Sequence, residues 1–271
     1  MMRSLWTSAS GMVSQQMNVD TIANNLANVN TIGYKKSRME FKSLLYETMQ
    51  RSGLDENGEG RPVNLQIGHG VRPIATVKTY TMGNIQVTNN PLDLAIDGDG
   101  FFAVQRSDDE IVYTRDGSFK ISVVDGEAMI VTSDGYPVLS IDDEPIYIPE
   151  DVNISDLIIN EDGTISYVDE DGETVELDGQ IQIVQFPNRA GLENIGQNFV
   201  KPTSASGDPI YEVDGDVNNI SKIIQGSLEY SNVQVVEEMV NLIIAQRAYE
   251  INSKAIQTSD DMLAQANQLK R

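Results

Sequence analysis

His69 is the only histidine of the chain and lies within Ile67-Gly-His-Gly-Val71. The chain contains no cysteine. One imidazole cannot form a two-histidine metal site, and without cysteine neither a disulfide nor a thiolate metal site can exist. A serine triad would have His69 as its only possible base. We therefore interpret His69 as a turn residue.

Two acidic clusters have the composition of calcium loops but not their spacing. In the first, Asp214 to Asn218, the sixth position is Asn219 where glycine is required, and the twelfth is Gln225 where glutamate is required. The second, Asp169-Glu-Asp-Gly172, fails the spacing as well. We interpret these acids as turn residues and predict no metal site.

Other catalytic patterns are equally weak. Gly68-His-Gly70 and Gly98-Asp-Gly100 lack the third glycine and the following helix of a dinucleotide loop. With 41 acidic residues a carboxylate pair for glycan hydrolysis is conceivable, but the sequence singles out none. We predict that the protein is not an enzyme, with no catalytic residue and no cofactor.

Charge is distributed very unevenly along the 271 residues. The net charge is −22, and residues 97–216 alone hold 28 acidic and five basic residues. Such a field repels nucleic acid and anionic membranes, so both are excluded as partners. The sequence has no apolar run long enough to cross a bilayer and no apolar stretch typical of a cleaved signal peptide near Met1. We expect export by a route that does not read such a signal.

The two ends of the chain are typical of amphipathic helices. In the N-terminal segment, which should end before Gly33, four apolar residues recur every seven positions: Leu5, Met12, Val19 and Leu26. From about Val235 to Leu269 a second helix without proline or glycine has its own seven-residue row: Val235, Leu242, Tyr249, Ile256 and Leu263. We predict that the two helices pair as a coiled coil.

The C-terminal helix carries a second apolar row on another side. Its members are Val240, Ile244, Ala248, Ile251, Ala255, Met262, Ala266 and Leu269. One partner helix covers one row, and each Leu, Ile or Met left in water forgoes about 1.5–3 kcal/mol. Neighbouring copies of the chain are the natural cover. The alternative is a helical hairpin packed on the chain's own β-domain.

Between the ends, repeated Asp-Gly pairs favour antiparallel hairpins from about 97 to 187. The predicted fold class is α+β, with long terminal helices and an acidic antiparallel β-domain. We divide the chain into a helical assembly domain (1–32 and 226–271), a connecting region (33–96 and 188–225) and the β-domain (97–187). Residues 50–70 are typical of a long exposed loop or an extended hairpin tip.

Several segments together resemble the rod and hook family of bacterial flagellar axial proteins. They are Ile22–Lys36, Asn90–Phe102, Tyr113–Phe119, Thr132–Val138, Gln225–Val233, Val236–Val240 and Gln246–Ile256. This similarity covers nearly the whole chain in order. The chain's length and the segment from Leu45 to Val71 are most similar to distal-rod members, although the acidic Asp55–Glu59 departs from their pattern.

The resemblance implies a structural subunit that polymerises helically into a stiff hollow rod, which transmits torque from motor to hook. It implies a place in the flagellar basal body, export through the type III apparatus, and contacts with copies of itself, with neighbouring rod and hook proteins and with ring proteins. In such packing the asparagines of Ile22–Asn30 would fix register, or would cap a helix end. The residues expected at subunit interfaces are Leu5, Met12, Val19, Ile22, Asn24, Asn25, Leu26, Asn28, Val29, Val235, Met239, Leu242, Ile244, Tyr249, Ile251, Ile256 and Leu263.

Two alternatives to a distal-rod subunit stay open at this point. One is another axial paralogue, such as a proximal-rod or hook-like protein. The other belongs to a different class, an acidic β-rich binding or adhesion module whose helical ends serve for display.

Overall fold

The computed structural model describes residues 2–50, 52–54, 60–61, 63–106, 110–124, 127–149, 152, 157–168, 174–214 and 220–269. The chain divides into two compact units, which we call the helical unit and the β-unit. The helical unit comprises residues 1–27, 37–77 and 234–271, and the β-unit comprises residues 28–36 and 78–233. None of the described helices is long and apolar enough to span a membrane.

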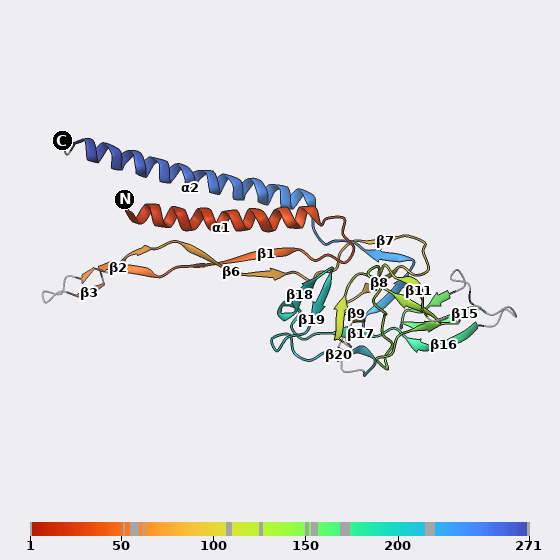
Figure 1. The fold of residues 1–271 in the computed structure, drawn as a ribbon. Coiled ribbons are helices and arrows are strands. Elements are labelled where there is room, and N and C mark those ends of the chain that lie inside the picture. Colours follow the sequence, from red (N-terminus) through yellow and green to blue (C-terminus); the bar gives the residue numbers. More distant parts are fainter. Residues whose placement is uncertain are drawn as a thin grey trace. The chain divides into compact units, whose positions relative to one another are not determined.

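Two helices and a β-ribbon form the helical unit (Figure 1). The helices are α1 (Met2–Ala27) and α2 (Val235–Leu269). The ribbon contains β1 (Ser37–Ser43), β2 (Tyr46–Gln50), β3 (Gly53–Leu54), β4 (Gly60–Arg61), β5 (Leu65–Gly68) and β6 (Val71–Lys78). β1 pairs with β6, β2 with β5 and β3 with β4, and α1 lies between α2 and the ribbon.

Both helices occur where the sequence predicts them. α2 begins at Val235 and ends at Leu269. The carboxylates of Glu237 and Glu238 in its first turn stabilise the helix, because they lie near the positive end of its dipole. At roughly 1.5 Å per residue its 35 residues span about 50 Å. α1 ends at Ala27, before Gly33, as expected. The sequence predicts the exposed loop or hairpin tip for residues 50–70. The structure has antiparallel pairs there, β2–β5 over 46–50 and 65–68 and β3–β4 over 53–54 and 60–61, and the acidic residues 55–59 lie outside the described part.

The β-unit contains the remaining strands, and its described pairs are antiparallel, as predicted. They are β7 (Ile85–Val87), β8 (Leu94–Asp97), β9 (Phe101–Arg106), β10 (Glu110–Thr114), β11 (Lys120–Val124), β12 (Glu127–Val131), β13 (Tyr147–Ile148), β14 (Leu157–Ile159), β15 (Thr164–Val168), β16 (Thr174–Gln180), β17 (Ile183–Gln185), β18 (Glu193–Gly196), β19 (Phe199–Lys201), β20 (Ile210–Tyr211), β21 (Lys222–Gln225) and β22 (Ser227–Glu229).

Six of these strands form the largest sheet, in the order β18-β19-β10-β9-β17-β20. Two three-stranded sheets, β11-β12-β13 and β14-β15-β16, and the pairs β21–β8 and β22–β7 complete the unit. Of the predicted Asp-Gly turns, Gly135 and Gly163 have the positive φ that such turns require. The pairs at Asp125, Asp171 and Asp214 lie at least partly outside the described residues.

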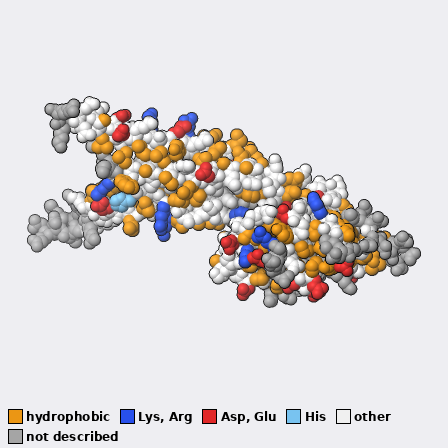
Figure 2. Space-filling view, viewed as in Figure 1, with side chains coloured by type: hydrophobic (Ala, Val, Ile, Leu, Met, Phe, Trp, Pro, Cys, Tyr) orange, Lys and Arg blue, Asp and Glu red, His pale blue; other side chains and the backbone are white. Residues whose placement is uncertain are grey.

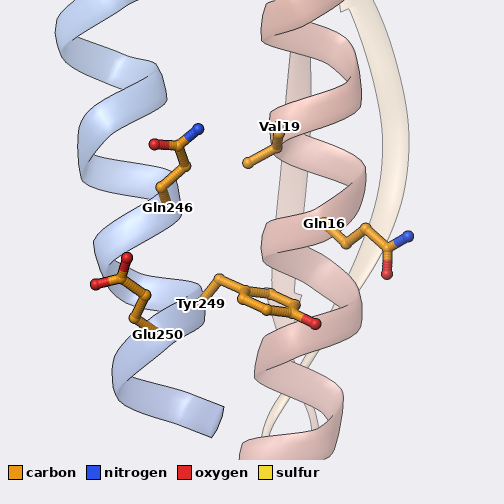
Figure 3. Close-up of a pocket in the computed structure, with 5 residues that line it drawn as sticks. All are labelled: Gln16, Val19, Gln246, Tyr249 and Glu250. Carbon is orange, nitrogen blue, oxygen red and sulfur yellow. The ribbon is translucent and has the colours of Figure 1, made fainter.

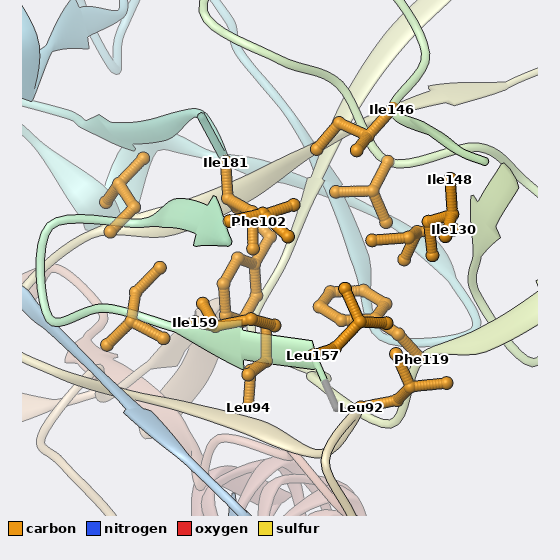
Figure 4. Packing of buried hydrophobic residues seen from close by; sticks show 14 of the residues in the cluster. Leu92, Leu94, Phe102, Phe119, Ile130, Ile146, Ile148, Leu157, Ile159 and Ile181 are labelled. Carbon is orange, nitrogen blue, oxygen red and sulfur yellow. The ribbon is translucent and has the colours of Figure 1, made fainter. Parts of the chain in front are cut away.

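The core of the β-unit lies on both faces of β9. Phe102 belongs to the larger apolar cluster and contacts Phe119 edge to face, at 5.1 Å between ring centres (Figure 4). Phe101 and Ala103, which point to the opposite face, belong to a second cluster with Phe186. A strand buried on both faces needs a continuous apolar run, and Phe101–Val104 supplies it.

The two units differ from the three-part division expected from the sequence. Residues 78–96 and 188–225, expected in a connecting region, belong to the β-unit. Residues 37–77, expected in a connecting region, belong to the helical unit because their ribbon packs along α1. Residues 28–36 and 226–233 belong to the β-unit, although the sequence-based division placed most of them with the helices.

Candidate functional site

Small and polar side chains take part in the contact between α1 and α2. The hydroxyl oxygens of Ser4 and Ser259 lie 3.3 Å apart. A Cβ added to Gly11 would lie 3.0 Å from the side chain of Asn252, so glycine is what lets the helices approach closely there. Ala245 on α2 is fully buried. Many large apolar side chains of both helices are left outside this contact.

The predicted seven-residue rows only partly face the interior of the helical unit. On α1 the four members, Leu5, Met12, Val19 and Leu26, are all half-buried, and their neighbour Ile22 is buried. On α2, Leu242, Ile256 and Leu263 are half-buried, whereas Val235 and Tyr249 are exposed. The helices lie side by side, and these rows supply part of their contact.

The exposed apolar residues form a surface that we call the outer helical surface. Its members are Trp6, Val13 and Met17 of α1, and Val235, Val236, Met239, Val240, Ile243, Ile244, Tyr249, Ile251 and Met262 of α2. Ile244 is 61% exposed and Ile251 69% exposed. Hydrophobic side chains are seen gathered along the helices in Figure 2. So many exposed apolar side chains on two adjacent helices mark an interaction surface.

A groove between the two helices interrupts this surface. It has a volume of about 340 Å³ and is lined by Gln16, Val19, Gln246, Tyr249 and Glu250. Figure 3 shows Tyr249 reaching from α2 toward α1, with Val19 on the facing helix. The groove could receive an apolar side chain from outside this chain.

The predicted asparagines occupy different environments. Asn25 is buried, and its amide nitrogen donates to the Oε2 atom of Glu238 at 2.9 Å and to the backbone oxygen of Ser37 at 2.8 Å. Its amide oxygen accepts from the backbone N–H of Ser37 at 2.9 Å. Asn25 thus joins the end of α1, the start of β1 and the start of α2 within one chain. The register role between copies that the resemblance implies for these asparagines stays a prediction.

The other asparagines of this segment are more exposed than Asn25. Asn24 is exposed, and Asn28, beyond the end of α1, accepts a hydrogen bond from the hydroxyl of Thr31 at 3.1 Å. Asn28 and the half-buried Val29 belong to the β-unit, so they are not part of the outer helical surface. Asn30 is exposed.

A buried group of charges holds together the parts of the β-unit that adjoin the helices in sequence. The carboxylate of Glu229 accepts from the Nζ atom of Lys35 at 2.6 Å, from the backbone N–H of Gly83 at 2.6 Å and from Arg115 at 3.2 Å. All three charged side chains are at most 3% exposed. Burial, together with the neighbouring Arg115, lowers the pKa of Lys35 to about 8.

Backbone contacts reinforce this charge cluster. The N–H of Gly33 donates to the backbone oxygen of Glu229 at 2.8 Å, and Arg115 donates to the backbone oxygen of Gly98 at 2.7 Å. Gly33 has φ +68°, and a Cβ there would lie 2.7 Å from the backbone of Asp116, so only glycine fits. The segment that follows α1 and the segment that precedes α2 are therefore fixed to the same carboxylate.

Sequence reasoning missed this cluster, although a signal was present. Lys35, Arg115 and Glu229 each lie in a different segment of the resemblance, and Lys35 and Glu229 are charges beside aromatic or apolar residues. The residues singled out for chemistry lie elsewhere: His69 is exposed, 3.8 Å from Glu47, and the Asp214 and Asp169 loops lie largely outside the described residues.

Comparison with known proteins shows the family. Residues 5–35 match the family model described as flagella basal body rod protein, residues 95–167 the flagellar hook protein FlgE/F/G D1 domain, and residues 224–269 the flagellar basal body rod FlgEFG protein C-terminal model. The flagellar basal-body rod protein FlgG of Borreliella burgdorferi is 50% identical over 100% of both chains. This chain belongs to the flagellar basal-body rod protein family. The family is structural, so the protein is not an enzyme, and its place is in the flagellum.

Two relatives from Bacillus subtilis differ in how similar they are to this chain. The flagellar basal-body rod protein FlgG of that bacterium is 38% identical over 100% of both chains. Its flagellar hook-basal body complex protein FlhP is 30% identical, also over 100% of both chains. Within one organism, the chain is thus more similar to the protein named FlgG. The ranges that match the three family models contain all three residues of the charge cluster and most of both helices.

Proposed function

We propose that this protein is the subunit of the distal flagellar rod and that it polymerises helically through its two terminal helices. The observation that carries this proposal is the outer helical surface. Small and polar side chains take part in the contact between α1 and α2, and many of the large apolar residues of both helices remain exposed. Each of these side chains would contribute about 1.5–3 kcal/mol if neighbouring copies covered it fully.

The greater similarity to FlgG than to FlhP favours a distal-rod subunit over another axial paralogue. In a rod, the helices of many copies would form the inner tube, and the acidic β-units would lie outside. The coiled-coil pairing of α1 with α2 belongs to this proposal, as do contacts with neighbouring rod and hook proteins and with ring proteins. The polymer would transmit torque from the motor to the hook.

The experiment compares two substitutions of equally exposed apolar residues. Ile244→Asp places a carboxylate on the outer helical surface, and Val123→Asp places one on β11 of the β-unit, where Val123 is 67% exposed. Neither residue is part of a core, so both variants should fold, which circular dichroism checks. We expect purified Val123→Asp to form sedimentable polymer like the wild type, and Ile244→Asp to remain in the supernatant. Normal polymers of Ile244→Asp would contradict the proposal.

A further inference from the structure

A polar hollow in the β-unit adjoins the charge cluster, since the backbone oxygen of its lining residue Thr81 accepts a hydrogen bond from Lys35 at 2.9 Å. Its volume is about 440 Å³. The end of β6, the segment that follows it, the turn before β9 and the segment after β17 contribute its lining: Lys78, Tyr80, Thr81, Asp99, Pro187, Asn188, Arg189 and Ala190. All of these residues belong to the β-unit.

The hollow carries positive charge in an acidic part of the chain. Lys78 and Arg189 line it, and the charge of Arg189 acts on Lys35 and Arg115 of the charge cluster, helping to lower the pKa of both. The carboxylates that face these cations are Asp99, paired with Arg189, and Glu229, paired with Lys35 and Arg115. The surrounding residues 97–216 hold 28 acidic and only five basic residues. A cationic hollow in such a surface attracts a carboxylate from outside.

Lys78 is the cation whose charge is least compensated. It is half-buried, its Nζ atom lies 5.7 Å from the centre of the Tyr34 ring, and no carboxylate pairs with it in the part of the chain that the structure describes. Burial lowers the pKa of Lys78. Removing an ammonium group from water costs free energy that the ring offsets only in part, and an incoming carboxylate would offset more.

Tyr80 is a second residue of this lining. Its hydroxyl is buried, and within the described residues it has no hydrogen-bond partner. Burial raises the pKa of Tyr80 to about 12, so the hydroxyl keeps its proton at neutral pH. Lys78 is thus the cation of this lining that an incoming side-chain carboxylate would pair with, because Arg189 already pairs with Asp99.

We propose that this hollow receives an Asp or Glu side chain from the β-unit of a second copy of the chain. The proposal rests on the proposed function, because polymerisation brings copies together at high local concentration. A second copy is the favoured donor because its own β-unit is rich in exposed acidic residues. The contact would join β-units, separately from the helices, and would fix the rotation of one copy relative to the next.

Carbodiimide cross-linking tests this directly, since it joins an amine only to a carboxylate in contact with it. Unlabelled and ¹⁵N-labelled chains are mixed, polymerised and treated, and cross-linked peptides are identified by mass spectrometry. Lys222 is the internal control, because its Nζ atom lies 2.7 Å from the Glu161 carboxylate of the same chain. We expect Lys222–Glu161 links within one isotope, and Lys78 links to acidic peptides that include mixed-isotope pairs.

Lys78 links confined to one isotope, or no Lys78 link while Lys222–Glu161 links form, would overturn the inference. Lys78 links that appear equally in unpolymerised chains would also overturn it. If electron microscopy shows that the wild-type chain forms no polymer, it is the proposed function that fails, whereas polymers without an interchain Lys78 link remove only the inference.

Two variants give an independent measure. We expect Lys78→Gln to raise the critical concentration for polymerisation roughly two- to tenfold at low salt, with a smaller effect at high salt. Lys222→Gln, which removes an exposed charge that already has a partner in its own chain, should leave the critical concentration unchanged. Equal critical concentrations for the two variants would contradict the proposed contact.

Discussion

At the scale of single residues, Glu229 connects more of the chain than any residue of the predicted site. One carboxylate holds Lys35, which follows α1 in sequence, Arg115 of the β-unit and the backbone of Gly83. A buried ion group contributes less to stability than its short distances suggest, because desolvation opposes the attraction. Removing one partner is different, because it leaves the others charged, buried and unpaired.

Glu229→Gln should therefore lower the free energy of unfolding by about 3–5 kcal/mol. Glu161→Gln is the matched control, since Glu161 pairs with Lys222 on the surface and its loss should cost about 0–1 kcal/mol. Urea unfolding followed by circular dichroism measures both. Equal destabilisation by the two substitutions would show that the buried carboxylate has no special role.

Lys35 gives the charge cluster a signature in pH. Its pKa is about 8 in the folded chain against an ordinary 10.5. Below pH 8 both states hold the proton and the cost of burying the charge is fully present. Between pH 8 and 10.5 the folded state releases the proton while the unfolded state keeps it, so the free energy of unfolding rises with pH.

We expect this rise in the wild type relative to Lys35→Met, with Arg115 still paired to Glu229 in the variant. Chemical unfolding of both proteins at intervals from pH 7 to 11 measures the difference between their free energies of unfolding. The contributions of the other titrating groups are common to both proteins and cancel in this difference. A difference that stays flat or falls over that range would contradict the assignment.

At the scale of elements, the seven-residue spacing predicts that both helices exist and where α2 begins and ends. It does not predict which side faces the partner, because several of the most buried positions are small or polar: Ser14, Asn25, Glu238, Ala245 and Ser259. Apolar periodicity predicts which side of a helix is hydrophobic. In a subunit that assembles, this side need not be covered by the same chain. The packing of the ribbon along α1 was not predicted, although residues 38–42 and 65–67 alternate polar and apolar residues as strands do, because alternation does not say which element a strand packs against.

Asn25 fixes the relation of three elements, so its removal should loosen the helical unit. We expect Asn25→Ala to lower the free energy of unfolding by about 2–3 kcal/mol, because it leaves Glu238 and the backbone of Ser37 with lost partners. The neighbouring exposed Asn24→Ala should change it by about 0.5 kcal/mol or less. Loss of the helical circular-dichroism signal on heating measures both, and similar melting curves for the two variants would refute the role of Asn25.

At the scale of the whole molecule, the sequence supports the α+β class, the antiparallel β-region and the family, because these rest on composition, Asp-Gly turns and motifs that extend over the whole chain. The meeting of Lys35, Arg115 and Glu229 could not be predicted, since it depends on long-range pairing such as that of β22 with β7. The charge distribution agrees with a division of roles, with acid concentrated in residues 97–216 and exposed apolar residues concentrated on the helices.

The central claim is that copies of this chain assemble by covering the outer helical surface. Helical reconstruction from electron micrographs of the polymer, at a resolution that places side chains, tests it most directly. We expect Ile244 and Ile251, both exposed in the single chain, to be buried against helices of neighbouring copies in an inner tube. A polymer whose copies touch only through their β-units, with Ile244 and Ile251 still exposed to solvent, would contradict the claim.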